Sequence, residues 1–328
     1  MNVLVTGYAG FIGFHLTNRL MDDKSISKIL AVDNLNNYYD TKLKKDRIKK
    51  LKAHKNYKKI INLNIDINNF NKLLEYSKRL RIKIIFHLAA QAGIRYSFIS
   101  PRSYIDSNLN GFFNILEIAR QLKIKKFIYA SSSSVYGESK KTPYSEKTMS
   151  NQPLQLYAAT KISNEVMAYA YSNLYKFTSI GLRFFTVYGP YGRPDMAIYK
   201  FVDAIYKNKK ITIYGANKMQ RDFTYIDDVI DGILKIFSDN SNMNRNLSNV
   251  YNLGLGKPVY IHDIIKKIEL ITGKKATLLQ KKSHNSEMNL THCSIKKLKS
   301  DYDYQPKIKI GVGLSKFIEW YKAYNNVN

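Results

Sequence analysis

The chain has 328 residues but only one cysteine, Cys293, and no apolar run approaching the length of a membrane span. A single thiol excludes an internal disulfide and a metal site built from several cysteines. A spanning helix needs roughly 18 consecutive apolar residues, which excludes a transmembrane segment. The six histidines are scattered without ligand spacing. Because the chain begins directly with a strand-like run, we expect a soluble, cytoplasmic protein with no metal and no membrane partner.

Acidic residues are also scarce. There are 25 Asp and Glu against 53 Lys and Arg, which gives a net charge of +28. Such a field attracts polyanions such as nucleic acid. The basic residues are spread along the whole chain, however, with the densest stretch at 42–59, and no recognised nucleic-acid-binding motif is present. We therefore expect no nucleic-acid partner, although the charge suits the attraction of a phosphorylated metabolite.

The first residues have the pattern of a dinucleotide-binding unit. An apolar strand over 2–6 is followed by the glycine turn GYAGFIG at 7–13 and a helix-period run. A second strand ends in Asp33, twenty residues beyond Gly13. Glycines at such a turn let a pyrophosphate approach the helix N-terminus, and the acid binds a ribose diol. An acid at that position repels a 2′-phosphate, so NAD is favoured over NADP.

Strands and helices continue to alternate, which predicts an α/β fold with a doubly wound parallel Rossmann sheet. The expected strands are 60–63, 82–87, 127–130 and 179–184, and the expected helices are 70–80, 108–122 and 155–175. A turn-rich segment at 189–194 then leaves the sheet. We expect a Rossmann domain at 1–184, completed by about 221–254. Residues 185–220 and 255–328 would form a smaller mixed α/β substrate lobe.

Tyr157 and Lys161 are four residues apart on one predicted helix face. A lysine ammonium beside a phenol favours the phenolate, which can remove a proton from an alcohol. The serine run 131–134 follows a predicted strand and would emerge at the sheet edge where ligands bind. Together these residues predict proton transfer beside a bound dinucleotide.

These motifs together resemble the extended short-chain dehydrogenase/reductase superfamily of sugar-nucleotide epimerases and dehydratases. Four longer segments look like those of UDP-glucuronate 4-epimerases, and they lie at 7–16, 32–40, 87–97 and 183–190. The resemblance covers nearly the whole chain. It implies tightly held NAD and a catalytic trio of Ser132, Tyr157 and Lys161.

The resemblance also implies the remaining binding residues. Those at the cofactor would be Gly7, Gly10, Phe11, Ile12, Gly13, Asp33, Asn34, Asp66, Ile67, Leu88, Ala89, Ala90, Tyr157 and Lys161. Those at the substrate would be Arg95, Ser132, Thr186, Arg193, Arg221 and Glu287. Ser286 and Glu287 stand where relatives usually have a Gly-Asp pair, so the longer side chain of Glu287 would have to bind the ribose hydroxyls.

Two features favour simple epimerisation of a uronate. Related dehydratases and decarboxylases carry carboxylates where this chain has Ser133 and Ser134. Oxidation of C4 in a glucuronate makes a β-keto acid, and we expect Arg193 with Thr186 to clamp its carboxylate against decarboxylation, because a guanidinium offers a planar fork. Arg221 would bind the diphosphate, unless it pairs with Asp222 or Asp227.

We therefore expect a UDP-glucuronate 4-epimerase that supplies UDP-galacturonate for surface polysaccharide. Two alternatives remain open. One is a 4-epimerase of another UDP-sugar, either UDP-glucose or an N-acetylated uronate. The other is a catalytically idle Rossmann protein that binds NAD or nucleic acid. The apolar stripes at 108–122 and 155–175 predict core helices, and the resemblance implies a homodimer formed through them.

Overall fold

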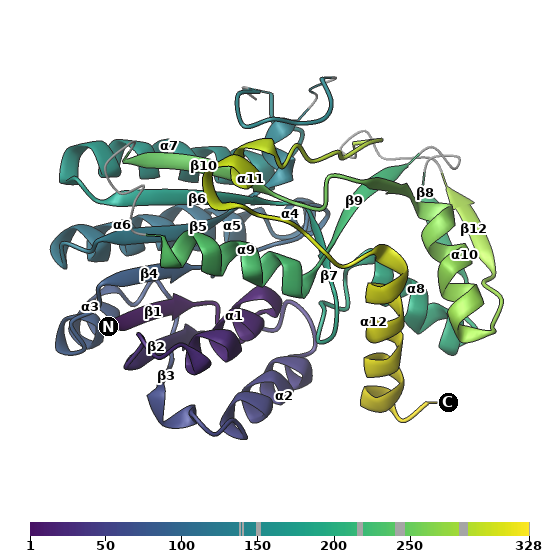
Figure 1. Cartoon of the computed structure of the whole chain (residues 1–328), viewed down its shortest axis with the longest axis horizontal. Helices are drawn as coiled ribbons and strands as arrows, with labels where there is room; N and C mark the ends of the chain where they lie inside the picture. Colours follow the sequence, from purple (N-terminus) through teal and green to yellow (C-terminus); the bar gives the residue numbers. More distant parts are fainter. Residues whose placement is uncertain are drawn as a thin grey trace. The chain divides into compact units, whose positions relative to one another are not determined.

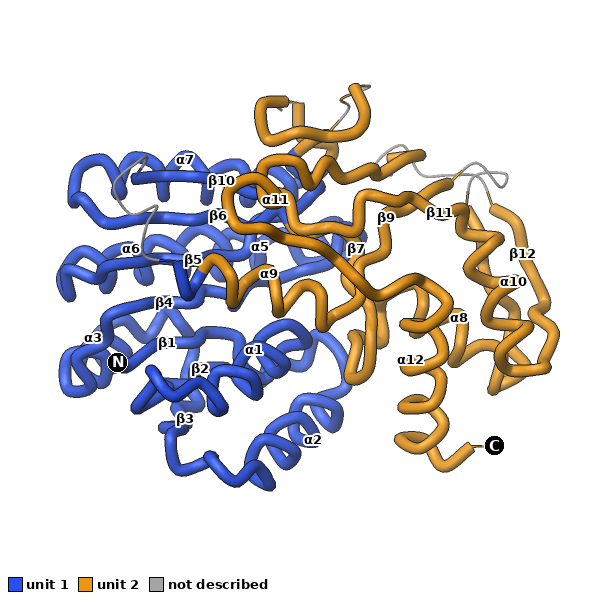
Figure 2. Tube along the Cα trace, viewed as in Figure 1, with its two compact units in different colours: residues 1–135, 155–183, 237–251 blue, residues 136–154, 184–236, 252–328 orange. Residues whose placement is uncertain are grey.

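The computed structural model describes residues 1–137, 139, 141–148, 152–214, 219–239, 247–281 and 288–327. The chain forms two compact units, which Figure 2 colours separately. Unit 1 contains residues 1–135, 155–183 and 237–251, and unit 2 contains residues 136–154, 184–236 and 252–328.

Unit 1 contains most of a seven-stranded sheet in the order β10-β6-β5-β4-β1-β2-β3 (Figure 1). Its strands are β1 (Asn2–Thr6), β2 (Lys28–Asp33), β3 (Ile60–Asn64), β4 (Ile84–His87), β5 (Lys126–Ser132), β6 (Thr178–Phe184) and β10 (Ser248–Leu253). β1 pairs in parallel with both β2 and β4, although β4 comes much later in the chain. The strand order therefore reverses beside β1, which is where open parallel sheets bind ligands.

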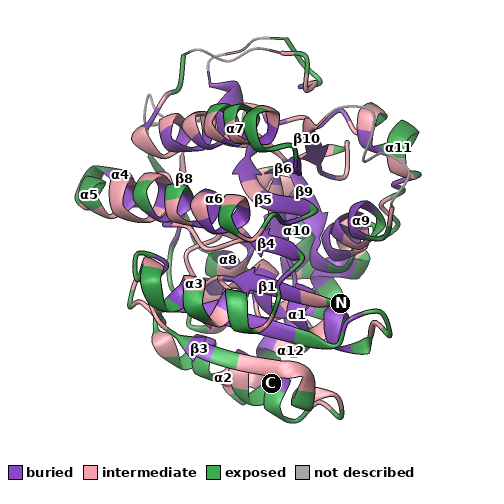
Figure 3. Cartoon of the chain, turned by 90° about the vertical axis from the view of Figure 1, so that its left-hand side faces the viewer, coloured by how far each residue is buried: buried purple, intermediate pink, exposed green. Residues whose placement is uncertain are grey.

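The helices of unit 1 agree with the predicted alternation. They are α1 (Phe11–Asp22), α2 (Thr41–Lys52), α3 (Phe70–Arg79), α4 (Tyr96–Ile99), α5 (Pro101–Tyr104), α6 (Gly111–Gln121) and α7 (Leu156–Tyr175). The helix predicted to begin at 108 instead starts with a π-helical segment, Ile105–Asn110, before α6. Figure 3 shows β1 and β4 as buried ribbons, whereas α2 and α3 carry exposed faces.

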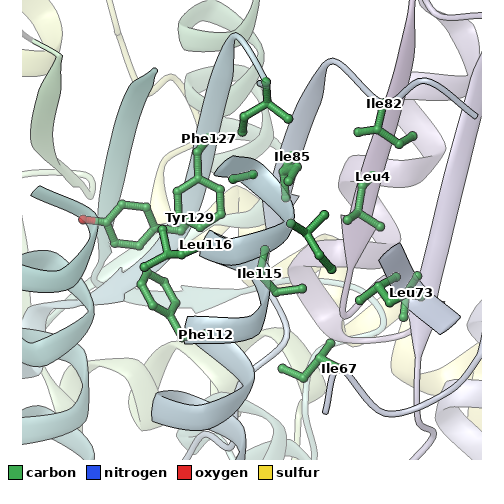
Figure 4. Close-up of a cluster of buried hydrophobic side chains, with 14 of the residues drawn as sticks. Leu4, Ile67, Leu73, Ile82, Ile85, Phe112, Ile115, Leu116, Phe127 and Tyr129 are labelled. Carbon is green, nitrogen blue, oxygen red and sulfur yellow. The ribbon is translucent and has the colours of Figure 1, made fainter. Parts of the chain in front are cut away.

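A buried apolar cluster packs α3, α6 and α7 against the sheet (Figure 4). Phe127 and Tyr129 of β5 stack with their ring centroids 5.3 Å apart. Phe112 of α6 meets both rings edge to face, at 5.7 and 5.3 Å. Truncating such a buried aromatic ring costs about 3–5 kcal/mol. The cluster therefore holds α7, which carries Tyr157, against the strand that carries Ser132.

Unit 2 has two smaller sheets, with the strand orders β11-β9-β7 and β12-β8. Its strands are β7 (Thr186–Tyr188), β8 (Ile211–Tyr214), β9 (Gln220–Tyr225), β11 (Pro258–Tyr260) and β12 (Leu278–Lys281), and its helices are α8 (Ala197–Tyr206), α9 (Ile226–Ser238), α10 (Ile261–Thr272), α11 (Lys296–Tyr302) and α12 (Ile310–Asn325). β9 pairs in parallel with β7 and antiparallel with β11. This is the smaller mixed α/β lobe expected from the sequence.

One prediction about this region is wrong. Residues 221–228 do not return to the large sheet, because β9 is held in unit 2. The buried Asp222 carboxylate accepts hydrogen bonds from the backbone N–H groups of Leu255, Gly256 and Cys293. A carboxylate bonded to three backbone amides satisfies its buried oxygens, and it ties β9 to two later loops.

The segment 136–154 also belongs to unit 2 rather than to the Rossmann domain. The N–H of Tyr144 donates to the carbonyl of His292 at 2.7 Å, and its ring stacks on Tyr136 at 4.7 Å. Cys293 forms an isolated bridge with Tyr144 and is buried. Within the described ranges, no helix is long and apolar enough to cross a bilayer.

Candidate active site

The glycine turn follows β1 and is closed too tightly for side chains. The backbone of Gly7 has φ +74°, and a Cβ there would lie 2.7 Å from the Ala89 nitrogen. A Cβ on Gly13 would lie 2.0 Å from the Gly7 carbonyl oxygen. Gly10 precedes α1 and has no side chain to cap its first N–H groups. The turn therefore presents bare backbone donors at a positive helix end, which fits the pyrophosphate of a dinucleotide.

Asp33 stands at the end of β2, beside this turn. Its carboxylate accepts the N–H of Ala9 at 3.2 Å and that of Leu35 at 2.8 Å. Burial raises the pKa of Asp33, and the ammonium of Lys44 opposes that rise. The carboxylate therefore braces the glycine turn as well as standing where a ribose diol is expected.

The residues predicted on the adenosine side also meet. The amide nitrogen of Asn34 donates to the Asp66 carboxylate at 2.6 Å. The side chain of Ile67 points into the core (Figure 4), where a Cβ on Gly111 would touch it at 2.4 Å. Only the backbone of Ile67 is therefore suited to contact a base.

Leu88, Ala89 and Ala90 follow β4 and close the opposite side of the glycine turn. The N–H of Leu88 donates to the Thr6 carbonyl at 3.1 Å, and the N–H of Ala89 to the Thr6 hydroxyl at 3.3 Å. The same hydroxyl bonds to Nδ1 of His87 at 2.7 Å. Burial and the charge of Lys161 lower the pKa of His87 to about 3, so this imidazole is neutral.

Tyr157 and Lys161 lie on adjacent turns of α7, as the spacing predicted. Lys161 is buried, and its ammonium donates to the carbonyl of Ala130 at 2.9 Å. Burial lowers the pKa of Lys161 to about 8, and the nearby charge of Glu165 opposes that shift. Tyr157 is half-buried, with its ring edge-on to Tyr104 at 6.1 Å. The Tyr157 side chain is therefore partly exposed to solvent and is not enclosed in the core.

Ser132 is the last residue of β5, two positions beyond the carbonyl that binds Lys161. It is buried, and its hydroxyl oxygen accepts the N–H of Ser134 at 3.1 Å. Its neighbour Ser131 instead donates to Glu165 of α7. The three predicted catalytic residues therefore belong to α7 and β5 of unit 1, and Lys161 ties α7 to the carboxyl end of β5.

Thr186 and Arg193 line one pocket in unit 2, together with Tyr188, Met196, Tyr199 and Phe317. Arg193 bonds to Asp195 through Nε at 2.9 Å and through Nη2 at 2.5 Å. The pocket is small and its surface is mostly apolar, but its lining brings together the Arg193 guanidinium and the Thr186 hydroxyl, two groups suited to a carboxylate.

The lining of this pocket does not include Arg95 or Arg221, two other predicted substrate residues that the structure describes. Nη1 of Arg221 in β9 donates to the carbonyls of Gln220 at 2.9 Å and Asn289 at 3.2 Å. The carboxylate of Asp222, one of the two suggested partners of Arg221, is bonded to backbone amides. Arg95 is exposed, next to α4 in unit 1. Glu287 lies outside the described residues.

Comparison with known proteins identifies the family of this chain. Residues 3–254 match the model of the "NAD dependent epimerase/dehydratase family". The chain belongs to this family. Among its members, the "Probable UDP-glucuronate 4-epimerase" of Rhizobium meliloti (strain 1021) is 38% identical over 335 residues, covering 98% of this chain and 97% of that protein. "UDP-glucuronate 4-epimerase 2" of Arabidopsis thaliana is 39% identical over 337 residues, and the match covers 99% of this chain and 76% of that protein.

The fold of this family member also matches a solved structure. The UDP-glucuronic acid 4-epimerase from Bacillus cereus, in complex with UDP-glucuronic acid and NAD, superposes with a TM-score of 0.90. It is 34% identical, and the match covers 99% of this chain and 100% of that one.

An ion pair that the sequence analysis did not predict lies close to Lys161. Glu165 of α7 accepts from Nε of Arg183 at 2.9 Å and from Nη2 at 2.7 Å, and both side chains are largely buried. Glu165 also receives the hydroxyl of Ser131. The available signal was its position four residues after Lys161, which places it on the same helix face.

Two buried basic residues that the sequence analysis did not predict lie beside the glycine turn. Arg47 of α2 is fully buried, and its Nη1 donates to the Ala9 carbonyl at 2.8 Å and to the Tyr39 hydroxyl at 2.6 Å. Lys44, one turn earlier, is also buried and donates to the carbonyl of Asn36 at 2.8 Å. The sequence suggested only a basic surface at 42–59. Arg47 and Lys44, two cations of this stretch, are instead buried.

Proposed function

We propose that the chain is a UDP-glucuronate 4-epimerase that holds NAD in unit 1 and converts UDP-glucuronate to UDP-galacturonate through a transient 4-keto sugar. The observation that carries this proposal is that Thr186 and Arg193 lie together in unit 2, because a guanidinium with a hydroxyl is suited to a uronate rather than to a neutral hexose. The Bacillus cereus enzyme with bound UDP-glucuronic acid and NAD supports it.

Each part of the glycine turn has a role toward the dinucleotide. The first N–H groups of α1, beside Gly10, Phe11, Ile12 and Gly13, would bind its pyrophosphate. Asp33 and Asn34 would bind the adenosine ribose, and Asp66 with the backbone of Ile67 would border the adenine. NAD, when bound, supplies a hydride acceptor that can return the hydride to the same carbon.

We propose that residues of α7 and β5 carry out the proton transfer. Tyr157 would remove the proton from the C4 hydroxyl, and Ser132 would hydrogen-bond the same oxygen. The ammonium of Lys161 stabilises the phenolate, because an adjacent positive charge lowers a phenol's pKa. Once the 4-keto sugar has turned its other face, return of the hydride to that face of C4 would invert the centre, and Tyr157 would return the proton to the C4 oxygen.

The chain must also keep the 4-keto sugar intact. A β-keto carboxylate loses carbon dioxide when the bond to the carboxylate aligns with the π system of the ketone. Arg193 and Thr186 would hold the carboxylate out of that alignment. Ser133 and Ser134 carry no acid or base of the kind that dehydratases and decarboxylases use at this place, and this favours epimerisation.

One experiment tests the proposal. Purified protein is incubated with UDP-glucuronate without added NAD, and the products are separated by chromatography. We expect UDP-galacturonate, and we expect Tyr157→Phe to keep its bound cofactor while turnover falls by about 10²–10⁴-fold. If no product forms even after NAD is added, the proposal is wrong. Conversion of UDP-glucose alone would favour the alternative of a neutral-sugar epimerase.

We further propose a cytoplasmic homodimer. UDP-sugars and NAD are metabolites of the cytoplasm. Phe113 of α6 and Val166 and Tyr169 of α7 are 44%, 63% and 62% exposed, and such apolar side chains on neighbouring helices suit a second copy of the chain.

A further inference from the structure

The guanidinium of Arg193 is held by a carboxylate of its own loop. Asp195 accepts from Nε at 2.9 Å and from Nη2 at 2.5 Å, so the two planar groups lie edge to edge. The two side chains are only 20% and 25% exposed. A half-buried bidentate pair of this kind fixes both the direction and the plane of the arginine fork.

The loop that presents this pair is itself closely packed. The N–H of Gly192 donates to the carbonyl of Gly189 at 3.0 Å, and the N–H of Met196 to that of Arg193 at 3.2 Å. The ring of Tyr191 lies 5.2 Å from Trp320 of α12. The backbone beneath Arg193 is therefore fixed, and the flexible stem of the arginine is what remains for Asp195 to order.

We propose that Asp195 is a positioning residue, which holds the Arg193 guanidinium in the plane where it grips the substrate carboxylate and so decides whether the 4-keto sugar is returned to a UDP-uronate or loses carbon dioxide. This inference rests on the proposed function. A guanidinium carries five N–H donors in one plane and is able to bridge two carboxylates. Asp195 pre-orders Arg193, so less rotamer entropy is lost when substrate binds.

The competing reaction defines what Asp195 prevents. In the 4-keto uronate, the C5–C6 bond breaks and carbon dioxide leaves. The bonding electron pair passes to C5 and forms an enolate with the C4 ketone, and a proton from water then adds to C5. The product is a UDP-4-ketopentose, and the hydride removed from C4 is left on the cofactor. A loosely held Arg193 permits this outcome because the carboxylate can rotate into line with the ketone.

The test compares Asp195→Asn with the wild type on UDP-glucuronate. Asn keeps the shape but loses the charge that strengthens both bonds to Arg193. We expect KM for UDP-glucuronate to rise about tenfold, the factor given by ~1.4 kcal/mol of lost interaction. We also expect UDP-4-ketopentose and reduced cofactor to appear, both absent in the wild type, and Asp195→Glu to restore part of the wild-type product ratio.

Two further variants make the result unambiguous. Asp263→Asn is the matched control, since Asp263 of α10 is 42% exposed and pairs with His262 at 3.0 Å outside the pocket, and it should behave as wild type. Arg193→Lys keeps the charge but loses the fork, so it should also yield ketopentose, and Asp195→Glu replaces Asp195→Asn in the comparison with the wild type if Asp195→Asn does not fold.

Two outcomes overturn the inference. If KM falls in Asp195→Asn, Asp195 competes with the substrate for Arg193 instead of positioning it. If KM and the product ratio stay at wild-type values, Asp195 has no role in the fate of the keto sugar. An inactive wild type would instead reject the proposed function, so the two failures are distinguishable.

Discussion

A buried lysine ammonium is costly unless nearby groups compensate its charge, and Lys161 has two such groups. The carbonyl of Ala130 accepts its hydrogen bond, and Glu165 supplies a negative charge one turn away on α7. The pKa of about 8 lies below the ordinary value of 10.5. The burial cost is therefore fully present below pH 8 and is relieved between pH 8 and 10.5. The state of Lys161 thus depends on a residue that touches no reactant.

Glu165→Gln tests this dependence. Glu165 raises the pKa of Lys161, so the variant should titrate below about pH 8. Because the proposed phenolate of Tyr157 would need the charged ammonium, the alkaline decline of kcat should begin at lower pH than in wild type. The pH profile of kcat measures this.

Two readouts separate this effect from lost stability. Removing one partner of the buried pair with Arg183 should also lower the free energy of unfolding by roughly 3–5 kcal/mol, which thermal denaturation would show. The exposed Glu319 of α12 offers the control Glu319→Gln, which should leave both measurements unchanged. An unshifted alkaline limb in Glu165→Gln would refute the assignment.

The spacing of residues predicted part of this site but not its supports. Tyr157 and Lys161 could be predicted because the helical repeat alone places them on one face. Arg47 could not, because its burial depends on α2 lying against the glycine turn, and a lysine-rich sequence gives no sign of which cation faces inward. The pairing of Asp195 with Arg193 could not be predicted either, since it depends on how their loop is folded.

At the scale of elements, β1, the glycine turn and α1 act as one piece. Their packing requires bare backbone at Gly7 and Gly13, and the sequence pattern predicted this turn. The pairing of β9 was not predictable in the same way. A short strand that contains Asp222 has no local feature that distinguishes one sheet from another, and its place is set by amides far away in the chain.

Gly13→Ala tests the packing of this piece. The new methyl group would lie 2.0 Å from the Gly7 carbonyl, so α1 must move away from the turn. We expect loss of bound NAD on purification and a free energy of unfolding lower by roughly 1–3 kcal/mol. Gly311→Ala in α12 has nothing within 4 Å of the added atom and should leave both unchanged. Full cofactor occupancy in Gly13→Ala would contradict the close packing.

At the scale of the whole molecule, chemistry is divided between the units. Unit 1 carries the groups suited to NAD and to proton transfer, and unit 2 carries those suited to the uronate. The net charge of +28 attracts the anionic diphosphate of a UDP-sugar toward either unit. One boundary between the units lies at 183 and 184, and the strand–helix alternation of the sequence ends at the same place. The membership of 136–154 was not, because it depends on contacts with residues near 292.

The proposed homodimer is tested on the exposed face of α7. Replacing both Val166 and Tyr169 with Asp places charge where a second copy would bury apolar surface. We expect sedimentation to show a monomer, whereas Leu270→Asp, at an 83% exposed position of α10, should leave the dimer intact. A double variant that sediments like the wild type would exclude this face.

The burial of Cys293 has a practical consequence. Its thiol is 2% exposed, and burial raises its pKa well above the usual range, so it stays protonated and out of reach of alkylating dyes. In the folded enzyme, Cys293 therefore does not react with thiol reagents. A single cysteine introduced at an exposed position would therefore be the only thiol that reacts with a fluorophore, and the emission of that label would report the binding of a nucleotide sugar.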